Sequence, residues 1–258
     1  MTNQSSITLF SFGYWGWGTS TVQLVQAFDA LEGRRGFNPP ILVDVRISRN
    51  VRAPGFNNRA LEKMVGADRY VHMPQLGDRA VIENTGEAVP IANPQAAGSL
   101  LDLAIGAEAT KRRILFFCAC PYQMQDGEPF CHRYEVGSLL LKQSRKLGRP
   151  IVVAEWPGTE PQVLRLTLPS EVLKKLQRGI KSVPLPRDTP LDRIASITWG
   201  SVVHCSGDGE RFDARIDRAK WSTNGWYLPV LDRLDENGGV ASNRETKAWG
   251  FFDRQSGT

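Results

Sequence analysis

Short apolar runs alternate with amphipathic stretches through the first 156 residues of the chain. The apolar runs predict strands at 6–14, 39–46, 69–77, 112–120 and 149–156. The amphipathic stretches repeat their apolar positions every three or four residues, which is the period of a helix. They predict helices at 21–33, 58–65, 93–109 and 132–148.

Strands that alternate with helices predict an α/β fold with a largely parallel sheet and helices on both faces. The strand centres "ILVDV", "ILFFC" and "PIVVA" are apolar throughout, as expected where both faces of a sheet are covered. Ligands of such folds bind beyond the carboxyl ends of the strands. We therefore expect the loops after the first, second and fourth strands to meet at one edge of the sheet.

The pattern changes after Trp156, which predicts an α/β domain over 1–156 and a separate segment over 157–258. In this second segment a helix is expected at 168–179, and the proline-rich stretch 182–190 is expected to break the chain. The stretch 195–221 alternates like a hairpin around Gly-Asp-Gly, and a further strand follows. These features predict a small C-terminal α+β extension.

Charge and hydropathy exclude some locations and partners. The net charge of +5, from 32 basic and 27 acidic side chains, accommodates a polyanionic partner without requiring one. No apolar run approaches the roughly 18 residues of a membrane helix, so no membrane contact is expected. The first residues lack the basic and apolar regions of a signal peptide. We expect a cytoplasmic protein whose thiols stay reduced and form no disulfide.

The stretch 116–133 contains three of the four cysteines and one of the three histidines. By number, Cys118, Cys120, Cys131 and His132 suffice for a tetrahedral zinc site. The usual two-residue gap between paired cysteines is missing, however, and Cys131 and His132 are adjacent. No cofactor and no metal are therefore predicted, and zinc at these four residues is kept as the alternative.

Five segments in order give the chain a resemblance to a known family. They are "ITLFSFGY" at 7–14, "LVDVR" at 42–46, "PGFNNRAL" at 54–61, "YVHMPQLGD" at 70–78 and "ILFFCAC…FCHRYEVGSLL" at 114–140. Over residues 7–155 the chain resembles the domain of unknown function 488 family, a widespread prokaryotic group without a settled activity. The family pattern has an acidic residue where this chain has Cys120.

The strand–loop–helix arrangement around His132 predicts an anion-binding site with a reactive thiol. A helix N-terminus attracts anions and lowers the pKa of a nearby thiol, so Cys131 or Cys118 is a candidate nucleophile. His132 is the candidate acid or base. Asp44 is a further catalytic candidate. Its alternative role is to hold Arg133 or His132 in place. Cys118 has the alternative role of a small buried apolar residue.

Arginines and aromatic residues near the same strand ends are candidate substrate contacts. Arg46, Arg52 and Arg133 suit a phosphate or carboxylate, because the guanidinium fork matches these groups. Tyr14 and Trp15 are candidates for stacking a base or sugar, with packing as the alternative. His72 is expected to reach the same cleft. His204, on the predicted hairpin, is expected to have a structural role. The tryptophans of the extension (Trp199, Trp221, Trp226 and Trp249) suit contact with a nucleic acid or a protein partner, and equally the core of a small sheet.

Taken together, these features predict an uncharacterised enzyme with a Cys/His/Arg anion-binding cleft, acting on a nucleotide or nucleic-acid substrate. One alternative is a thiol-dependent sulfur or phosphoryl transferase with a layout like that of rhodaneses. The other is a nucleic-acid-binding module without catalytic activity. The expected partner is thus an anionic small molecule or a nucleic acid.

Overall fold

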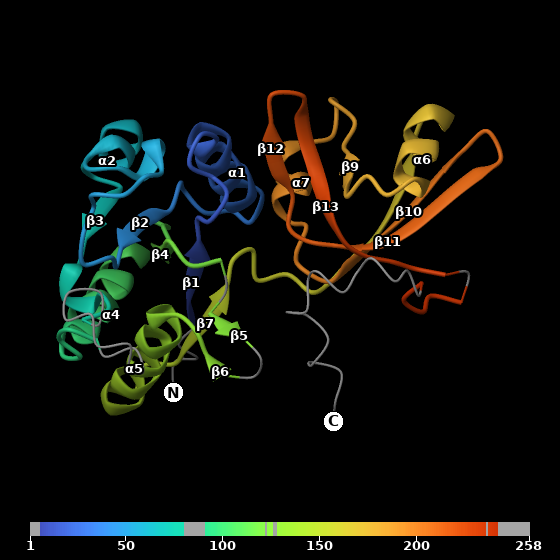
Figure 1. Ribbon diagram of the computed structural model, residues 1–258. Helices are drawn as coiled ribbons and strands as arrows, with labels where there is room; N and C mark the ends of the chain where they lie inside the picture. Colours follow the sequence, from blue (N-terminus) through green and yellow to red (C-terminus); the bar gives the residue numbers. More distant parts are fainter. Residues whose placement is uncertain (1–5, 80–90, 122, 126–127, 236, 242–258) are drawn as a thin grey trace. The chain divides into compact units, whose positions relative to one another are not determined.

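The computed structural model describes residues 6–79, 91–121, 123–125, 128–235 and 237–241 (Figure 1). The chain divides between Trp156 and Pro157 into two compact units, which we call unit 1 and unit 2. Trp249 and its neighbours lie outside the described residues. Among the helices of the described part, none is long and apolar enough to cross a membrane.

Unit 1 contains a five-stranded sheet in which every pairing is parallel. Its order is β3-β2-β4-β1-β7. The strands are β1 (Ile7–Gly13), β2 (Ile41–Asp44), β3 (Tyr70–His72), β4 (Ile114–Cys118) and β7 (Ile151–Glu155). The predicted α/β class and parallel sheet are confirmed.

In the described part of unit 1, four α-helices and several short elements connect these strands. The helices are α1 (Thr21–Arg34), α2 (Ala60–Val65), α4 (Ala96–Glu108) and α5 (His132–Leu147). Short 3-10 turns, η1 (Pro54–Phe56) and η2 (Pro74–Leu76), follow β2 and β3, and β5 (Met124–Gln125) pairs with β6 (Glu128–Pro129). Helix α5 ends at Gly148, whose φ of 62° suits glycine. The expected end of α1 at Gly33 is wrong, because the helix runs to Arg34 and the left-handed glycine is Gly36.

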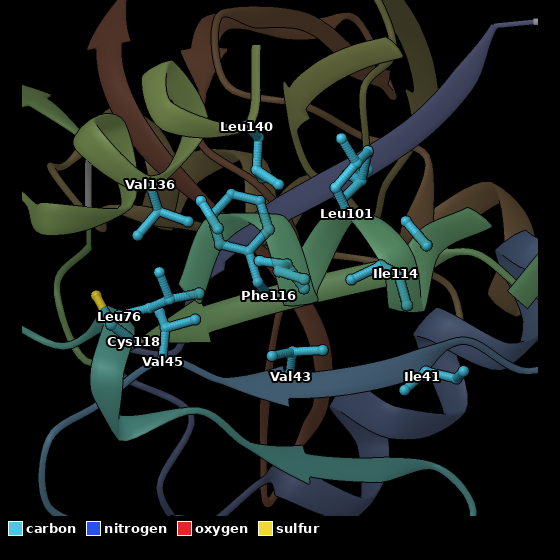
Figure 2. Close-up of a cluster of buried hydrophobic side chains, with 14 of the residues drawn as sticks. Ile41, Val43, Val45, Leu76, Leu101, Ile114, Phe116, Cys118, Val136 and Leu140 are labelled. Carbon is cyan, nitrogen blue, oxygen red and sulfur yellow. The ribbon is translucent and has the colours of Figure 1, made fainter. Parts of the chain in front are cut away.

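The main core of unit 1 lies where α4 and α5 pack on the sheet (Figure 2). Val43 of β2 and Phe116 of β4 are fully buried and face Leu101 of α4 and Leu140 of α5. The next residues along the strands face the other way: Phe12 of β1 contacts Phe28 of α1 edge-on, with ring centroids 5.1 Å apart. Alternate strand residues thus fill two separate apolar layers, which explains the absence of polar alternation in the sequence.

Unit 2 is built on a mixed, mostly antiparallel sheet of six strands. Its order is β12-β13-β11-β10-β8, and β9 pairs with β13. The elements are β8 (Val163–Thr167), α6 (Ser170–Gln177), β9 (Ser182–Pro184), α7 (Leu191–Ala195), β10 (Ser201–Gly207), β11 (Glu210–Ile216), β12 (Lys220–Ser222) and β13 (Gly225–Arg233). Asp208 and Gly209 form the β10–β11 turn with φ of 47° and 79°, as the Gly-Asp-Gly sequence predicts.

The expectation that 182–190 only breaks the chain is wrong in part. Residues Ser182–Pro184 form β9, which pairs antiparallel with β13. A proline is tolerated there because β9 lies at an edge of the sheet and has one partner strand. Strand β8, which pairs parallel with β10, was not anticipated by the sequence pattern.

Candidate functional site

The parallel register brings the carboxyl ends of β1, β2 and β4 together. Gly13 lies beside Cys118, and Asp44 lies beside Phe117. The loops that follow these strands leave the sheet at the same edge, as expected. The sequence-predicted residues at this edge fall into two hydrogen-bonded groups.

The first group is a cluster of three thiols, which we call the thiol cluster: Cys118, Cys120 and Cys131. Cys118 ends β4 and is buried next to Val45 and Leu76 (Figure 2). Cys120 follows in the loop and is half-buried. The three sulfur atoms lie within 4.8 Å of one another, and the sulfurs of Cys118 and Cys131 are 3.0 Å apart. All three cysteines are free thiols.

Cys131 occupies the N-cap of α5, where its sulfur accepts a hydrogen bond from the backbone N–H of Arg133. The extended backbone of Cys131 and the bond from its N–H to the Gln123 carbonyl, 3.1 Å, hold it there. Because sulfur takes the place of the oxygen that normally caps a helix, the helix N-terminus favours a thiolate at this position.

The electrostatics differ sharply among the three thiols. Hydrogen bonds from the Cys118 and Cys120 thiols, aided by the positive charge of Arg133, lower the pKa of Cys131. Burial raises the pKa of Cys118. The bond with Cys118 lowers the pKa of Cys120, but the bond to Cys131 and burial outweigh it and raise this pKa to about 11. Within the cluster, ionisation is therefore favoured at Cys131 over Cys118 and Cys120.

Arg133 joins the thiol cluster to an acidic partner at the end of β7. Its guanidinium is fully buried, with Nε 3.4 Å from the Cys131 sulfur and Nη1 3.0 Å from both carboxylate oxygens of Glu155. Nη2 donates to the Cys120 carbonyl at 3.0 Å. Ser11 and Gln123 donate to the same carboxylate of Glu155. Glu155 thus neutralises the charge of Arg133 inside the protein.

The second group is centred on the buried pair Asp44 and Arg46. Nε and Nη2 of Arg46 donate to the two oxygens of Asp44 at 2.7 and 2.5 Å. Arg46 also donates to the Tyr14 hydroxyl, and Tyr70 donates to Asp44, at 2.8 and 2.7 Å. Burial raises the pKa of Tyr14. Tyr14 stacks on Phe56, with ring centroids 3.9 Å apart.

The two predicted site histidines bind backbone carbonyls. His132 Nε2 donates to Val45 at 3.1 Å, so its Nδ1 is left facing the Cys131 sulfur at 3.9 Å. His72 Nε2 donates to the Arg46 carbonyl at 2.9 Å. His204 lies in unit 2, where its Nδ1 is 2.9 Å from Asp213 Oδ1.

The structure thus places the predicted residues unevenly. Cys118, Cys131, His132 and Arg133 come together, and Asp44, Arg46, Tyr14 and His72 form a neighbouring group. Trp15, 66% exposed, and Arg52, also exposed, lie outside both groups. Because Arg46 and Arg133 each pair with an internal carboxylate, this geometry gives no support to their predicted role of binding an external phosphate or carboxylate.

Several residues of this edge were not anticipated from the sequence. Ser11, Tyr70, Gln123 and Glu155 complete the two groups. Glu155 and Ser11 gave a usable signal, since each is a polar residue inside an otherwise apolar predicted strand. Gln123 gave none, because its contacts depend on the path of the loop after β4.

Comparisons with known proteins add no assignment. No family model, curated protein or solved structure matches this chain. The resemblance to the domain of unknown function 488 family stays a prediction.

Proposed function

We propose that unit 1 binds a thiophilic divalent metal, with zinc as its representative, through Cys118, Cys120 and Cys131, and that this centre is the functional site. The observation that carries the proposal is the convergence of three sulfur atoms within 4.8 Å from a strand end, a loop and a helix N-cap. Tetrahedral zinc with Zn–S bonds of about 2.3 Å needs thiolates roughly 3.8 Å apart. The observed separations, 3.0 Å for the Cys118–Cys131 pair and at most 4.8 Å within the cluster, lie on both sides of that spacing.

The surroundings of the thiol cluster suit a metal–thiolate centre. Three thiolates around a divalent ion leave one net negative charge. The guanidinium of Arg133, which also pairs with Glu155, lies 3.4 Å from the Cys131 sulfur. The N-terminus of α5 adds a partial positive charge. N–H donors to the sulfur atoms, such as Arg133 and the backbone of Cys120, are the outer-shell contacts that tune such sites.

Three protein ligands leave a fourth position for an exchangeable ligand, which is typical of catalytic rather than structural zinc sites. The substrate class expected from the sequence, an anionic molecule of the nucleotide type, offers phosphate oxygens for that position. We therefore favour a metal-dependent enzyme over a purely structural zinc site. In this interpretation Arg133, Glu155 and Ser11 position the cluster and do not contact substrate.

A thiol-dependent transferase is the second candidate, and the position of Cys131 favours it. Its sulfur is a helix N-cap, has Arg133 beside it, and has His132 Nδ1 at 3.9 Å. Cys118, 3.0 Å away, is placed to act as a second thiol. This arrangement matches the expected nucleophile of a sulfur or phosphoryl transferase.

Metal analysis of the purified full-length protein separates the two candidates. We expect about one zinc per chain in wild type and in Cys205→Ser, whose cysteine lies in unit 2 outside the thiol cluster. Cys120→Ser should bind zinc more weakly by at least about tenfold, because the loss of even an outer-shell partner costs about 10–100-fold in metal affinity. Because Cys120 is half-buried, this variant tests binding with little risk to folding.

Cobalt substitution supplies an independent readout, because thiolate–cobalt charge-transfer bands report the number of sulfur ligands. Wild type and Cys205→Ser should give the same band, and Cys120→Ser a weaker one. A protein that is metal-free with all thiols reduced, and that takes up neither zinc nor cobalt, would contradict the proposal. Selective alkylation of Cys131 in that metal-free protein would then support the transferase.

A further inference from the structure

A pocket of about 430 Å³ opens on unit 2 between α6, β9 and the β12–β13 hairpin. Its lining includes Lys175, Ile180, Ser222, Asn224, Trp226 and Tyr227. The volume lies in the range of about 300–1,000 Å³ that is usual for small-ligand sites. We call it the unit 2 groove.

Two aromatic residues at the start of β13, Trp226 and Tyr227, line the groove. Both residues are half-buried, and Trp226 also packs against the apolar core of unit 2. Trp221 lies opposite Trp226 in the strand register and contacts it edge-on, with ring centroids 5.6 Å apart and planes at 73°. This contact fixes the plane of Trp226. Fixed aromatic faces of this kind are platforms on which nucleobases stack.

The other residues that line the groove carry hydrogen-bonding side chains. None of the lining residues that the structure describes is an aspartate or glutamate. Ser182, Ser222 and Asn224 lie on two sides of the groove. Ser222 Oγ accepts from the Asn224 N–H at 3.2 Å, which fixes the hairpin turn. Hydroxyl and amide side chains at the rim can pair with base edges without selecting one base strongly.

The chain that borders the groove is positively charged. Five exposed basic residues occur between Val172 and Arg187, and this segment contains no aspartate or glutamate. They are Lys174, Lys175, Arg178, Lys181 and Arg187. One exposed acid, Glu171 or Asp188, flanks the segment on each side. An exposed run of one sign beside an aromatic wall is complementary to a polyanion that also offers aromatic rings.

We propose that the unit 2 groove binds single-stranded nucleic acid, with bases stacked on Trp226 and Tyr227 and phosphates paired with Lys175, Lys181 and their basic neighbours. A single strand fits this chemistry better than a duplex, because its bases are free to leave their stack. The inference goes beyond the metal centre of unit 1, since it uses none of the cysteines. It gives the chain a recognition site separate from its chemistry.

Fluorescence anisotropy of the full-length protein with a labelled strand of about twelve thymidines tests the inference. We expect binding that weakens steeply with salt. Lys175→Gln combined with Lys181→Gln should lower the affinity at least severalfold and make the salt dependence shallower. Lys142→Gln, an exposed lysine on α5 of unit 1, is the matched control and should leave both unchanged.

Two further variants test the contribution of base stacking to binding. Tyr227→Ala should weaken binding roughly tenfold, the scale of one lost base–aromatic contact. Trp226→Phe keeps an apolar ring in the wall and should weaken binding less. Cys120→Ser should bind the labelled strand like wild type. The proposal for the metal centre and the proposal for the groove can therefore fail independently of each other.

Three results would overturn the inference. One is the absence of binding to the strand at low salt. Another is an equal effect of Lys142→Gln and of the Lys175/Lys181 pair, which would indicate diffuse attraction. The third is self-association in sedimentation experiments that Tyr227→Ala abolishes, because the groove would then be an interface between copies of the chain.

Discussion

Arg133 and Glu155 form an ion pair at the carboxyl edge of the parallel sheet, with Nη1 3.0 Å from both carboxylate oxygens. The arginine side chain is fully buried, and the glutamate side chain is 35% exposed. The same guanidinium contacts the Cys131 sulfur. The pair therefore links the last strand of unit 1 to the thiol cluster.

Replacing Glu155 by Gln should destabilise the protein by about 2–3 kcal/mol. The substitution leaves Arg133 buried without its counter-charge, which costs about 3–5 kcal/mol for a fully buried pair; solvent near the exposed part of Glu155 reduces this figure. Urea unfolding measures the change. Asp68→Asn, at a surface pair with Arg112, is the control and should stay within about 0.5 kcal/mol of wild type. Equal effects of the two substitutions would contradict the assigned role of Glu155.

Replacing Asp44 by Asn should destabilise the protein more, by about 3–5 kcal/mol. Both members of the Asp44–Arg46 pair are buried, so the remaining guanidinium has no charge partner and little water. Tyr70→Phe removes one neutral donor from the same carboxylate and should cost only about 1 kcal/mol. If Asp44→Asn instead folded with wild-type stability, Arg46 would be available to an external anion, and the substrate-binding role expected from the sequence would regain support.

Gly13→Ala should disturb the thiol cluster directly. A Cβ at Gly13 would lie 1.9 Å from the Cys120 carbonyl oxygen and 2.9 Å from Nη2 of Arg133. The loop that carries Cys120 must move, at an expected cost of at least about 2 kcal/mol. Zinc binding should weaken with it, measured by competition with a chromogenic chelator.

The matched glycine control is Gly106→Ala in α4. Among the described residues outside the backbone of its own helix, no atom lies within 4 Å of the added Cβ, and the change should stabilise the helix by about 0.5–1 kcal/mol. A loss of zinc binding in Gly106→Ala, or wild-type zinc binding in Gly13→Ala, would show that the close approach at Gly13 does not position the cluster.

Cys205 should make the stability of unit 2 fall at alkaline pH. Burial, with a smaller contribution from Asp213, raises the pKa of Cys205 to about 12 from a normal value near 9. Between these values the unfolded chain loses the thiol proton while the folded chain keeps it, so stability is full below pH 9 and falls as pH rises toward 12. Thermal unfolding monitored from pH 8 to about 11 should show a smaller decline for Cys205→Val. An identical decline in both proteins would mean that the decline has another source.

The pattern of the sequence by itself determined the architecture of unit 1. Continuous apolar runs at strand length, separated by helical periodicity, left few alternatives to a parallel sheet, and the order of the segments placed Cys118, Asp44 and the start of α5 at one edge. The glycine at 148 and the Gly-Asp-Gly turn followed from backbone sterics that act within a few residues.

Only the tertiary structure decided which charges are available at that edge. The sequence shows that Arg46 lies at the end of a strand and Arg133 at the start of a helix. It does not show that Asp44 and Glu155 neutralise these arginines, because the contacts depend on strand register and on the path of a loop. The convergence of Cys120 with Cys118 and Cys131 has the same origin. The spacing of the cysteines along the chain did not match a usual zinc motif. The tertiary fold nevertheless brings the sulfur atoms of Cys118, Cys120 and Cys131 within 4.8 Å of one another.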